Sequence, residues 1–416
     1  MITSRTLPDG KSSAEAIVTP SMRILLLSDW MSNRGGAESY ILSLRDELRA
    51  QGDEVRLVSC GPRSAEGAAD SRAYGSDALA MQAVLQLVNP FAASHVRAVV
   101  RDFQPDAAIV SQFAYHLSPA IFRALGRVPT AVTMMDYKAI CPTGTRLLPN
   151  GSHCTVRRSI ACNTNGCVSY AHWLRDAPRY SLINTGLQRA TRVLCPSSWM
   201  QKELHEAGID AAVVPLGVTT SSARAGTPSG EPVLAYVGRF SREKGVAVLI
   251  AAFAKVLNDF PGARLRLIGD GPLAENLRAL AGLLGIAASV EFHGWSSADA
   301  VQKHLDDAWC VVCPSLWAEP FGLAAIESLM LGIPVVASDT GGFRETVEHE
   351  TTGILFRTGD VDSLADALTA VVNGTRFSTH RLSPETIERT AERHGIRSHA
   401  TRVKGVIRDM LATTLT

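Results

Sequence analysis

This sequence has little net charge, no long apolar run and no apolar leader, and each absence excludes some classes of function. Its 416 residues carry 41 basic and 40 acidic side chains, a formal net charge of +1. Duplex nucleic acid as a partner normally requires a strongly basic face, so near-neutrality favours a small-molecule ligand. Apolar stretches such as VLAYVG and AWCVVCPSLW are well short of the about 18–20 residues that span a bilayer, which predicts no transmembrane helix.

The first twenty residues, MITSRTLPDGKSSAEAIVTP, lack the apolar central region of a secretory signal. We therefore expect residues 1–20 to form a disordered leader on a cytoplasmic protein. In that reducing compartment, the eight cysteines are more typical of thiols or metal ligands than of disulfides.

Two halves of the chain repeat an alternation of buried strands and amphipathic helices. The first begins with the strand pattern MRILLLSDW, the loop MSNRGG and the helix pattern AESYILSLRDELRAQG, and it recurs as far as RVLCPSS. The stretch TTSSARAGTPSGEP has linker composition, and the alternation restarts at VLAYVG. This predicts an α/β protein of two Rossmann-like doubly wound halves that face each other across a ligand-binding crevice.

The same patterns give the expected domain boundaries. With 46% hydrophobic residues, the chain can bury two cores. We expect an N-terminal domain at 21–218, with a cysteine-rich insert at 141–167, and a C-terminal domain at 219–382. Residues 383–416 are helical in composition and are expected to pack back across the first half.

The loop GRFSREKG places Arg239, Arg242 and Lys244 directly before a helix. Cations at a helix N-terminus oppose the helix dipole, so something negative is expected among them. A diphosphate satisfies both these side chains and the free N–H groups of the helix. A solvated basic loop, or ion pairs with acids such as Glu243, is the alternative.

The loop RGGAES follows the first strand of the first half. Gly35 and Gly36 let the backbone approach a ligand closely before the helix begins. A tight turn without a ligand is the alternative, and Glu38 then simply complements the helix dipole.

The stretch LWAEPFGLAAIES carries two glutamates, Glu319 and Glu327, around the start of an apolar helix. Glu327 has no basic residue three or four positions away, so its carboxylate needs hydrogen bonds from elsewhere unless it is solvated. Glu319 precedes Pro320 at a strand end, where the crevice is expected. The hydroxyl groups of a sugar or ribose are donors that a carboxylate accepts without a cation.

Four cysteines fall in a stretch rich in Gly, Asn and Thr and poor in core residues: Cys141, Cys154, Cys162 and Cys167. Four thiols in a weakly packed loop form a tetrahedral structural zinc site in some proteins. The spacing lacks a C-x2-C knuckle, so free thiols remain the alternative.

Two other patterns that resemble metal sites have structural explanations. Cys310 and Cys313 form C-x2-C inside a strand, where residues three apart point to opposite faces, so both are expected in the core. The D-x-D of GDVDSLADAL opens a helix, so Asp360 or Asp362 is expected to be its N-cap.

The segments YVGRFSREKG, LRLIGDGP, VEFHGW and EPFGLAAIESLMLGIPVVASDTGGFRETV occur in this order. Together they resemble glycosyltransferase family 4, retaining enzymes with the GT-B fold, over about Met22 to Val372. The most specific element is E-x7-E. The resemblance implies transfer of a sugar from a UDP or GDP donor to an acceptor hydroxyl, in polysaccharide or glycoconjugate biosynthesis. It also implies an acceptor-binding first domain, a nucleotide-sugar-binding second domain and no catalytic metal or cofactor.

The resemblance implies roles for individual residues. Arg239 and Lys244 bind the donor diphosphate and help it to depart, Glu319 contacts the hydroxyls of the donor sugar, and Glu327 contacts the ribose. The other implied donor-binding residues are Gly35, Gly36, Gly269, Gly271, His293, Gly294, Trp295, Phe321, Gly322 and Leu323.

The first half resembles a subgroup that reads H-D-Y…C-P…C…C, but here the segment is MMDYKAICP, with Met135 in place of the histidine. A methionine neither hydrogen-bonds a sugar hydroxyl strongly nor carries a proton. Either His116 or Asp136 substitutes, the sugar specificity differs, or activity is weak or lost. We expect Asp136 among the catalytic residues with Glu319, Arg239 and Lys244, and His116, Met135 and Tyr137 on the acceptor or sugar side.

Other functions and partners remain open at this point. A non-catalytic nucleotide-sugar-binding protein and a GT-B-fold epimerase are alternatives, whereas a dinucleotide dehydrogenase is disfavoured because neither half shows G-x-G-x-x-G. The acceptor is a carbohydrate, a lipid-linked molecule or a small molecule. The stretch HWLRDAPRYSLINTGLQRATR permits peripheral contact with the inner face of a membrane, and a solvated helix face is the alternative.

Overall fold

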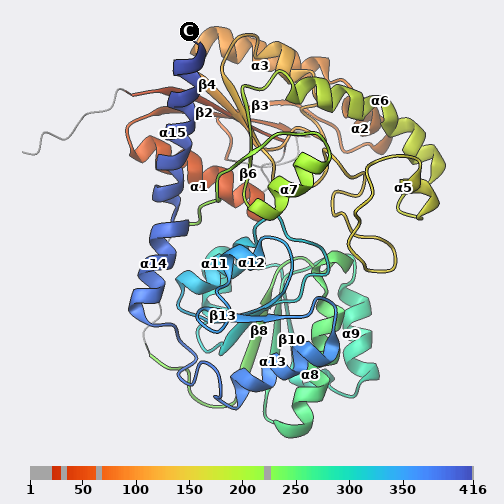
Figure 1. Cartoon of the computed structure of the whole chain (residues 1–416), viewed down its shortest axis with the longest axis vertical. Coiled ribbons are helices and arrows are strands. Elements are labelled where there is room, and N and C mark those ends of the chain that lie inside the picture. Colours follow the sequence, from red (N-terminus) through yellow and green to blue (C-terminus); the bar gives the residue numbers. More distant parts are fainter. Residues whose placement is uncertain (1–20, 30–34, 62–67, 220–225, 415–416) are drawn as a thin grey trace, which may run out of the picture.

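Two parallel sheets, one above the other, form the framework of the chain (Figure 1). The computed structural model describes residues 21–29, 35–61, 68–219 and 226–414, so the predicted leader at 1–20 lies outside the described residues. The sheets divide between residues 213 and 233, where the linker composition occurs. The predicted α/β class with two doubly wound halves is confirmed.

The first sheet has seven parallel strands in the order β3-β2-β1-β4-β5-β6-β7. Leu25, Leu26 and Leu27 of β1, an inner strand, are fully buried. Helices cover both faces of such a sheet, which is why the strand is a continuous apolar run. The strand order reverses between β1 and β4, the position where ligands bind in open α/β sheets. The strands are β1 (Arg23–Ser28), β2 (Glu54–Gly61), β3 (Ser71–Tyr74), β4 (Ala107–Val110), β5 (Thr130–Thr133), β6 (Arg192–Cys195) and β7 (Ala212–Val213).

Seven helices accompany this sheet within the described residues. α1 buries Tyr40, Ile41, Leu44 and Leu48 on one face, and the chain turns at Gly52, whose φ is +90°. The sequence analysis assigned no element to residues 62–106, where the structure has β3, α2 and α3. The helices are α1 (Gly36–Ala50), α2 (Leu79–Leu85), α3 (Pro90–Phe103), α4 (Ile121–Ala124), α5 (Ala161–Thr164), α6 (Tyr170–Leu187) and α7 (Ser198–Glu206).

The second sheet has six parallel strands in the order β10-β9-β8-β11-β12-β13. Cys310 and Cys313 are buried and join apolar clusters that contain different residues of this half, as predicted for opposite faces of a strand. The order reverses between β8 and β11. The strands are β8 (Val233–Val237), β9 (Arg264–Ile268), β10 (Val290–Gly294), β11 (Cys310–Cys313), β12 (Val335–Ser338) and β13 (Gly353–Phe356).

The helices of the second half follow the predicted alternation. Asp360 caps α13 by accepting the N–H of Ser363 at 2.9 Å, which confirms the N-cap prediction for the D-x-D stretch. The helices are α8 (Val246–Asp259), α9 (Ala274–Leu283), α10 (Ala298–His304), α11 (Leu323–Met330), α12 (Phe343–Thr346) and α13 (Val361–Val372), with 3-10 turns η1 (Arg242–Lys244) and η2 (Ala287–Ser289).

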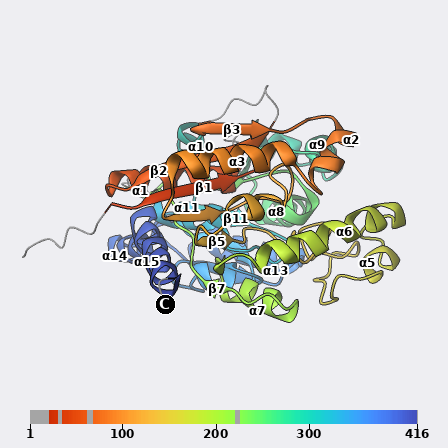
Figure 2. The ribbon, with the colours of Figure 1, turned by 90° about the horizontal axis from the view of Figure 1, so that it is seen from above.

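The last two helices, α14 (Pro384–His394) and α15 (Ile396–Thr414), connect the halves. α14 packs on α11 of the second half, and α15 packs on α1 of the first, which confirms the predicted crossing back (Figure 1). The hydroxyl of Tyr40 bonds to Nε2 of His399 at 2.9 Å, and Lys404 pairs with buried Asp53 at 2.8 Å. Figure 2 shows α14 and α15 at one end of the molecule and α5 and α6 at the other. None of the described helices is long and apolar enough to cross a bilayer.

Candidate active site

The two halves meet through residues that follow the carboxyl ends of strands in both sheets. A Cβ atom at Gly36, after β1, would lie 3.2 Å from Leu323 of α11. The hydroxyl of Ser197, after β6, donates to the carbonyl of Pro320 at 2.6 Å. The predicted donor residues Gly36 and Leu323 are therefore adjacent across the interface, while Gly35 is exposed beside them as the N-cap of α1.

Glu319 lies at the centre of this region and is 7% exposed. Its Oε1 accepts hydrogen bonds from Nζ of Lys244 and from the hydroxyl of Ser315, both at 2.7 Å. Burial opposes its ionisation, but the Lys244 charge and these hydrogen bonds outweigh burial and hold the pKa of Glu319 below its usual range. Lys244 also lies 5.4 Å from the centroid of the Trp317 ring. The structure thus joins two residues that the resemblance assigned to different parts of the ligand.

The backbone before α11 is held by Gly322, which the resemblance assigned to the donor site, and by Gly342, which the sequence analysis did not single out. Gly322, the N-cap of α11, has a φ of +90°, and a Cβ there would meet Phe343 at 2.5 Å. The N–H of Gly342 donates to the carbonyl of Glu319 at 2.7 Å, and a Cβ at Gly342 would lie 2.6 Å from the Cα of Phe321. These contacts place the first N–H groups of α11 beside Glu319, where a helix N-terminus attracts an anion.

Arg239 and Glu327 are both exposed, and they carry opposite charges. Arg239 follows β8, and its positive charge reaches Tyr115 of the first half. Glu327 is on α11, and surrounding protein atoms partly desolvate its carboxyl group although the residue as a whole is exposed. This desolvation raises the pKa of Glu327 to about 7. The group therefore changes charge near neutral pH.

The loops after β8, β9 and β10 pack closely because glycines let their backbones approach. The N–H of Gly269 donates to the carbonyl of Gly294 at 2.8 Å. A Cβ at Gly269 would lie 1.9 Å from the carbonyl oxygen of Gly238, and one at Gly271 would lie 2.5 Å from that of Phe240. The predicted glycines thus form one continuous surface at the strand ends.

The two predicted aromatic residues of this surface differ in their surroundings. Trp295 is 57% exposed and is free to stack with a ligand. The ring of His293 instead lies against that of His304 of α10 at an interplanar angle of 45°, with centroids 4.1 Å apart, and its Nε2 lies 3.3 Å from Glu291. His293 is therefore already in contact with its own half of the protein.

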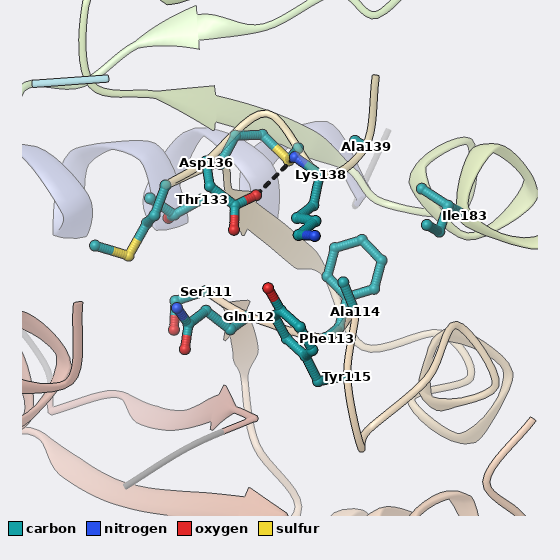
Figure 3. A pocket seen from close by; sticks show the side chains of 12 residues that line it. Ser111, Gln112, Phe113, Ala114, Tyr115, Thr133, Asp136, Lys138, Ala139 and Ile183 are labelled. Atoms are coloured by element: carbon teal, nitrogen blue, oxygen red, sulfur yellow. Dashed lines mark hydrogen bonds between the residues drawn. The ribbon is translucent and has the colours of Figure 1, made fainter. Parts of the chain in front are cut away.

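A pocket opens at the carboxyl ends of β4 and β5 in the first half (Figure 3). The carboxylate of Asp136, the ammonium of Lys138 and the hydroxyl of Tyr115 point toward the same space. Asp136 and Met135 are the predicted residues that it contains. The sequence analysis did not single out the other lining residues, which are Ser111, Gln112, Phe113, Ala114, Tyr115, Thr133, Met134, Lys138, Ala139 and Ile183.

Burial shifts the two charged groups of this pocket toward neutrality. It raises the pKa of Asp136, although the N–H of Lys138 donates to its Oδ1 at 2.8 Å. It lowers the pKa of Lys138 despite the nearby Asp136 charge. Met135 presents a thioether at the position of the subgroup's histidine, and it packs against an apolar cluster to which both halves contribute.

His116 and Tyr137, which the sequence analysis expects on the acceptor or sugar side, do not line this pocket. Both side chains are fully buried. Asp29, at the end of β1, accepts the backbone N–H groups of Tyr115, His116 and Leu117 at 2.6–2.8 Å and so folds their turn inward. The Tyr137 ring stands edge-on to Trp317 at 6.0 Å between centroids.

The four cysteines of the insert line a second pocket together. All are half-buried free thiols: Cys141, Cys154, Cys162 and Cys167. Burial and the other three thiols raise the pKa of Cys167. Within the described chain, no three His, Cys, Asp or Glu side chains already have a geometry that holds a metal ion. The structure therefore gathers the predicted ligands but not in the arrangement of a formed zinc site.

The insert is anchored to α7 of the first half by a buried charge cluster. Glu203 pairs with Nε of Arg146 at 2.5 Å and with Nε2 of His153 at 3.0 Å. Burial opposes ionisation of Glu203, but the bonds from His153 and Arg146 hold its pKa below the usual range.

The insert also touches the second half. Arg242 donates to the backbone carbonyls of Leu148 and Pro149 at the tip of the insert. Arg242 therefore does not stand with Arg239 and Lys244 as a free cation. It links the insert to the loop that carries them.

Two family models match the chain. One, described as Glycosyltransferase Family 4, matches residues 34–222, and the other, described as Glycosyl transferases group 1, matches residues 218–389. The two matches adjoin and include every donor-site residue discussed above. They divide the chain where the two sheets divide.

Similar curated proteins match mainly over part of the chain. An uncharacterized glycosyltransferase of Methanocaldococcus jannaschii is 35% identical over 152 residues, 36% of this chain and 38% of the relative. A GDP-mannose-dependent alpha-(1-6)-phosphatidylinositol monomannoside mannosyltransferase of Mycobacterium tuberculosis is 34% identical over 143 residues, 33% of this chain and 37% of the relative. The alignments thus span well under half of the length of these relatives.

Solved structures match almost the whole chain at low identity. Sucrose-phosphate synthase from Thermosynechococcus elongatus is 22% identical with a TM-score of 0.72, covering 94% of this chain and 100% of that one. Anabaena HepE in complex with UDP and glucose is 20% identical with a TM-score of 0.68, covering 93% and 100%. Both likenesses concern the fold. From the adjoining family matches and this fold, we conclude that the chain belongs to the group 1, family 4 glycosyltransferases and has the GT-B fold.

Proposed function

We propose that this chain is a retaining hexosyltransferase that moves a sugar from a UDP or GDP donor to an acceptor hydroxyl. The observation that supports it most is the ion pair of Lys244 with Glu319, four residues before α11, because an ammonium group near a helix N-terminus suits an anion. Arg239, on the loop after β8, is close enough to the first half for its charge to act on Tyr115. Such a site neutralises a diphosphate as negative charge develops on it.

The proposed chemistry needs no enzymic nucleophile. The bond between the anomeric carbon and the diphosphate oxygen breaks, and the acceptor oxygen bonds to the same face of that carbon. The acceptor's proton passes to the leaving phosphate. Arg239, Lys244 and the N–H groups of α11 stabilise the departing charge. Glu319 accepts from the sugar hydroxyls, and Glu327 accepts from the ribose.

We propose that the transfer is independent of a catalytic metal, because these cations and the helix terminus supply the positive charge. Any metal would then be structural. The four insert cysteines are its proposed ligands, and their thiols would have to turn into the shared pocket to form a tetrahedral site. Thiols that are only half-buried and hold weak hydrogen bonds leave room for that movement.

The proposed acceptors are carbohydrate, lipid-linked or small molecules, with cell-surface polysaccharide or glycoconjugate as the product. Tyr170 and Leu174 are exposed on α6, with Arg175 next to them. Such a face suits peripheral contact at the inner surface of a membrane. Co-sedimentation with anionic lipid vesicles tests this contact, and Leu174→Glu should abolish it.

One observation favours a second function. Met135 lines the first-half pocket in place of a histidine, and neither His116 nor Tyr137 reaches that pocket. A protein that binds the nucleotide sugar without turning it over would have this arrangement. Calorimetry with UDP- and GDP-sugars, together with a donor-hydrolysis assay, separates the two. Binding without hydrolysis or transfer to any acceptor would support the second function, and an epimerase would convert the donor with no acceptor present.

A further inference from the structure

The first-half pocket contains a lysine that the proposed transfer does not use. The Lys138 ammonium lies 5.6 Å from the centroid of the Tyr115 ring and donates to the carbonyl of Pro142 at 3.1 Å. Among the described residues, no carboxylate is within ion-pair distance of it, although the charge of Asp136 is close enough to act on it. An ammonium has three donors, so two remain for a ligand.

The side chain of Lys138 is held in place rather than free to swing. Gly144 has a φ of +79°, and a Cβ there would lie 2.9 Å from Cε of Lys138, so the lysine stem fills the space that only a glycine leaves. At one end the backbone N–H is fixed on Asp136, and at the other the ammonium is fixed on Pro142. A donor positioned before the ligand arrives loses little side-chain entropy on binding.

The charges that face the pocket balance each other. Asp136 contributes one carboxylate and Lys138 one ammonium. Behind them, Arg179 is paired with Asp176 and donates to the carbonyl of Ala114. A ligand with a net charge therefore gains little here, whereas a hydroxyl group both donates to a carboxylate and accepts from an ammonium. Two neighbouring hydroxyls satisfy both side chains at once.

We infer that Lys138 and Asp136 together bind two adjacent hydroxyl groups of the acceptor, which is therefore a neutral polyol, either a sugar or a cyclitol, rather than a simple alcohol. This inference rests on the proposed function for the identity of the pocket as the acceptor site. Lys138 is its specificity-determining residue. Leaving either charged group buried without its hydroxyl partner costs binding energy, which is the source of the discrimination.

The variant Lys138→Met tests the inference, because methionine keeps an unbranched stem over Gly144 and removes the donors. Lys202→Met on α7, an exposed lysine outside the pocket, is the matched control. Methyl α-glucoside and myo-inositol are the polyol probes, and hexan-1-ol is the simple alcohol. Saturation-transfer NMR measures the binding of these probes without turnover. Hydrolysis of UDP-glucose or GDP-mannose without acceptor measures the reaction of the donor alone.

We expect Lys138→Met to weaken polyol binding and to raise the acceptor KM about tenfold or more, as loss of a charged hydrogen bond does. Donor hydrolysis and nucleotide affinity should stay within about twofold of the parent, as should every property of Lys202→Met. Unchanged polyol binding in Lys138→Met, or equal use of hexan-1-ol by the parent protein, overturns the inference. A parent protein that binds polyols but neither binds nor hydrolyses any donor would instead contradict the proposed function.

Discussion

Lys244 and Glu319, 75 positions apart in the chain, form an ion pair of 2.7 Å between Nζ and Oε1. The pair keeps a carboxylate ionised inside the protein where burial alone would favour its neutral form. In the proposed donor complex, a diphosphate at the start of α11 would compete with Glu319 for Lys244. Glu319 would then be released to accept a hydrogen bond from a sugar hydroxyl, so one rearrangement would prepare the protein for both the diphosphate and the sugar of the donor.

The variant Lys244→Met should lower kcat/KM for transfer by about 100-fold or more, the usual effect of removing one donor that stabilises a developing negative charge. It also leaves the Glu319 carboxylate buried without its cation, which destabilises the fold. The double variant Lys244→Met/Glu319→Gln should therefore regain thermal stability without regaining activity. Transfer assays and thermal unfolding measure the two effects.

Lys255→Met is the control for charge alone, since Lys255 is exposed on α8 and pairs only with surface Asp362. Its activity and stability should match the parent protein. Near-normal turnover of Lys244→Met would remove Lys244 from the proposed site.

Because the pKa of Glu327 is raised to about 7, we expect the free energy of unfolding and the affinity for the nucleotide to change in opposite directions with pH. The folded protein holds a proton on Glu327 between its ordinary pKa and about 7, whereas the unfolded chain has lost it. The free energy of unfolding should therefore fall as pH rises through this window. Ribose hydroxyls donate to the ionised form, so nucleotide affinity should rise with pH and level off above about 7.

Glu327→Gln removes this titration and is the reference for both measurements. Calorimetry with UDP from pH 5.5 to 8 should show a steeper rise in the parent protein than in Glu327→Gln, which retains only the titration of the nucleotide itself. Identical pH profiles for the two proteins would show that Glu327 does not meet the nucleotide.

The buried charge cluster on Glu203 should be a large contributor to the stability of the first half. Glu203→Gln leaves the buried Arg146 guanidinium without its anion, and breaking a buried pair costs about 3–5 kcal/mol. The midpoint of thermal unfolding should fall by about 6 °C or more. Glu275→Gln, at an exposed pair on α9, should change unfolding by no more than about 0.5 kcal/mol. Equal midpoints for the two variants would contradict the prediction.

The insert cysteines should bind zinc at about one ion per chain after reconstitution, if the thiols close on the metal as proposed. Elemental analysis of the dialysed protein measures this content. Cys154→Ser and Cys167→Ser should lose the ion and unfold at lower temperature, whereas Cys60→Ala, a buried thiol far outside the insert in sequence, should keep it. Zinc content near zero in the reconstituted parent protein would leave the four residues as free thiols.

The pattern of apolar and polar residues in each segment predicted the architecture well, because this pattern depends on how the segment is buried. The continuous apolar run at Leu25–Leu27, the opposite faces of Cys310 and Cys313, and the cap at Asp360 each follow from the geometry of a single element. β3 and α2 were missed since both are short and only partly buried.

The sequence analysis named many residues of the candidate site but did not predict which of them contact each other. No local pattern shows that Lys244 meets Glu319, or that Arg242 turns to the carbonyls of the insert, because these contacts depend on how loops of different strands come together. The burial of His116 could not be predicted for the same reason: Asp29, which is distant in sequence, holds the turn that contains it. The Lys138 pocket lies on loops without a distinctive spacing.

α15 returns to the first half after the whole second half has been built, and Ala400, Val403, Ile407 and Met410 complete the core beneath β1 and α1. At the crossing, Val218 and Gly395 form a bridge, so the outgoing and returning chains lie together. In topological terms the second half is an insertion within the first. A fragment cut at residue 218 would lack part of its own interior, whereas a chimera that exchanges only the stretch between these two crossings would keep the recipient half intact.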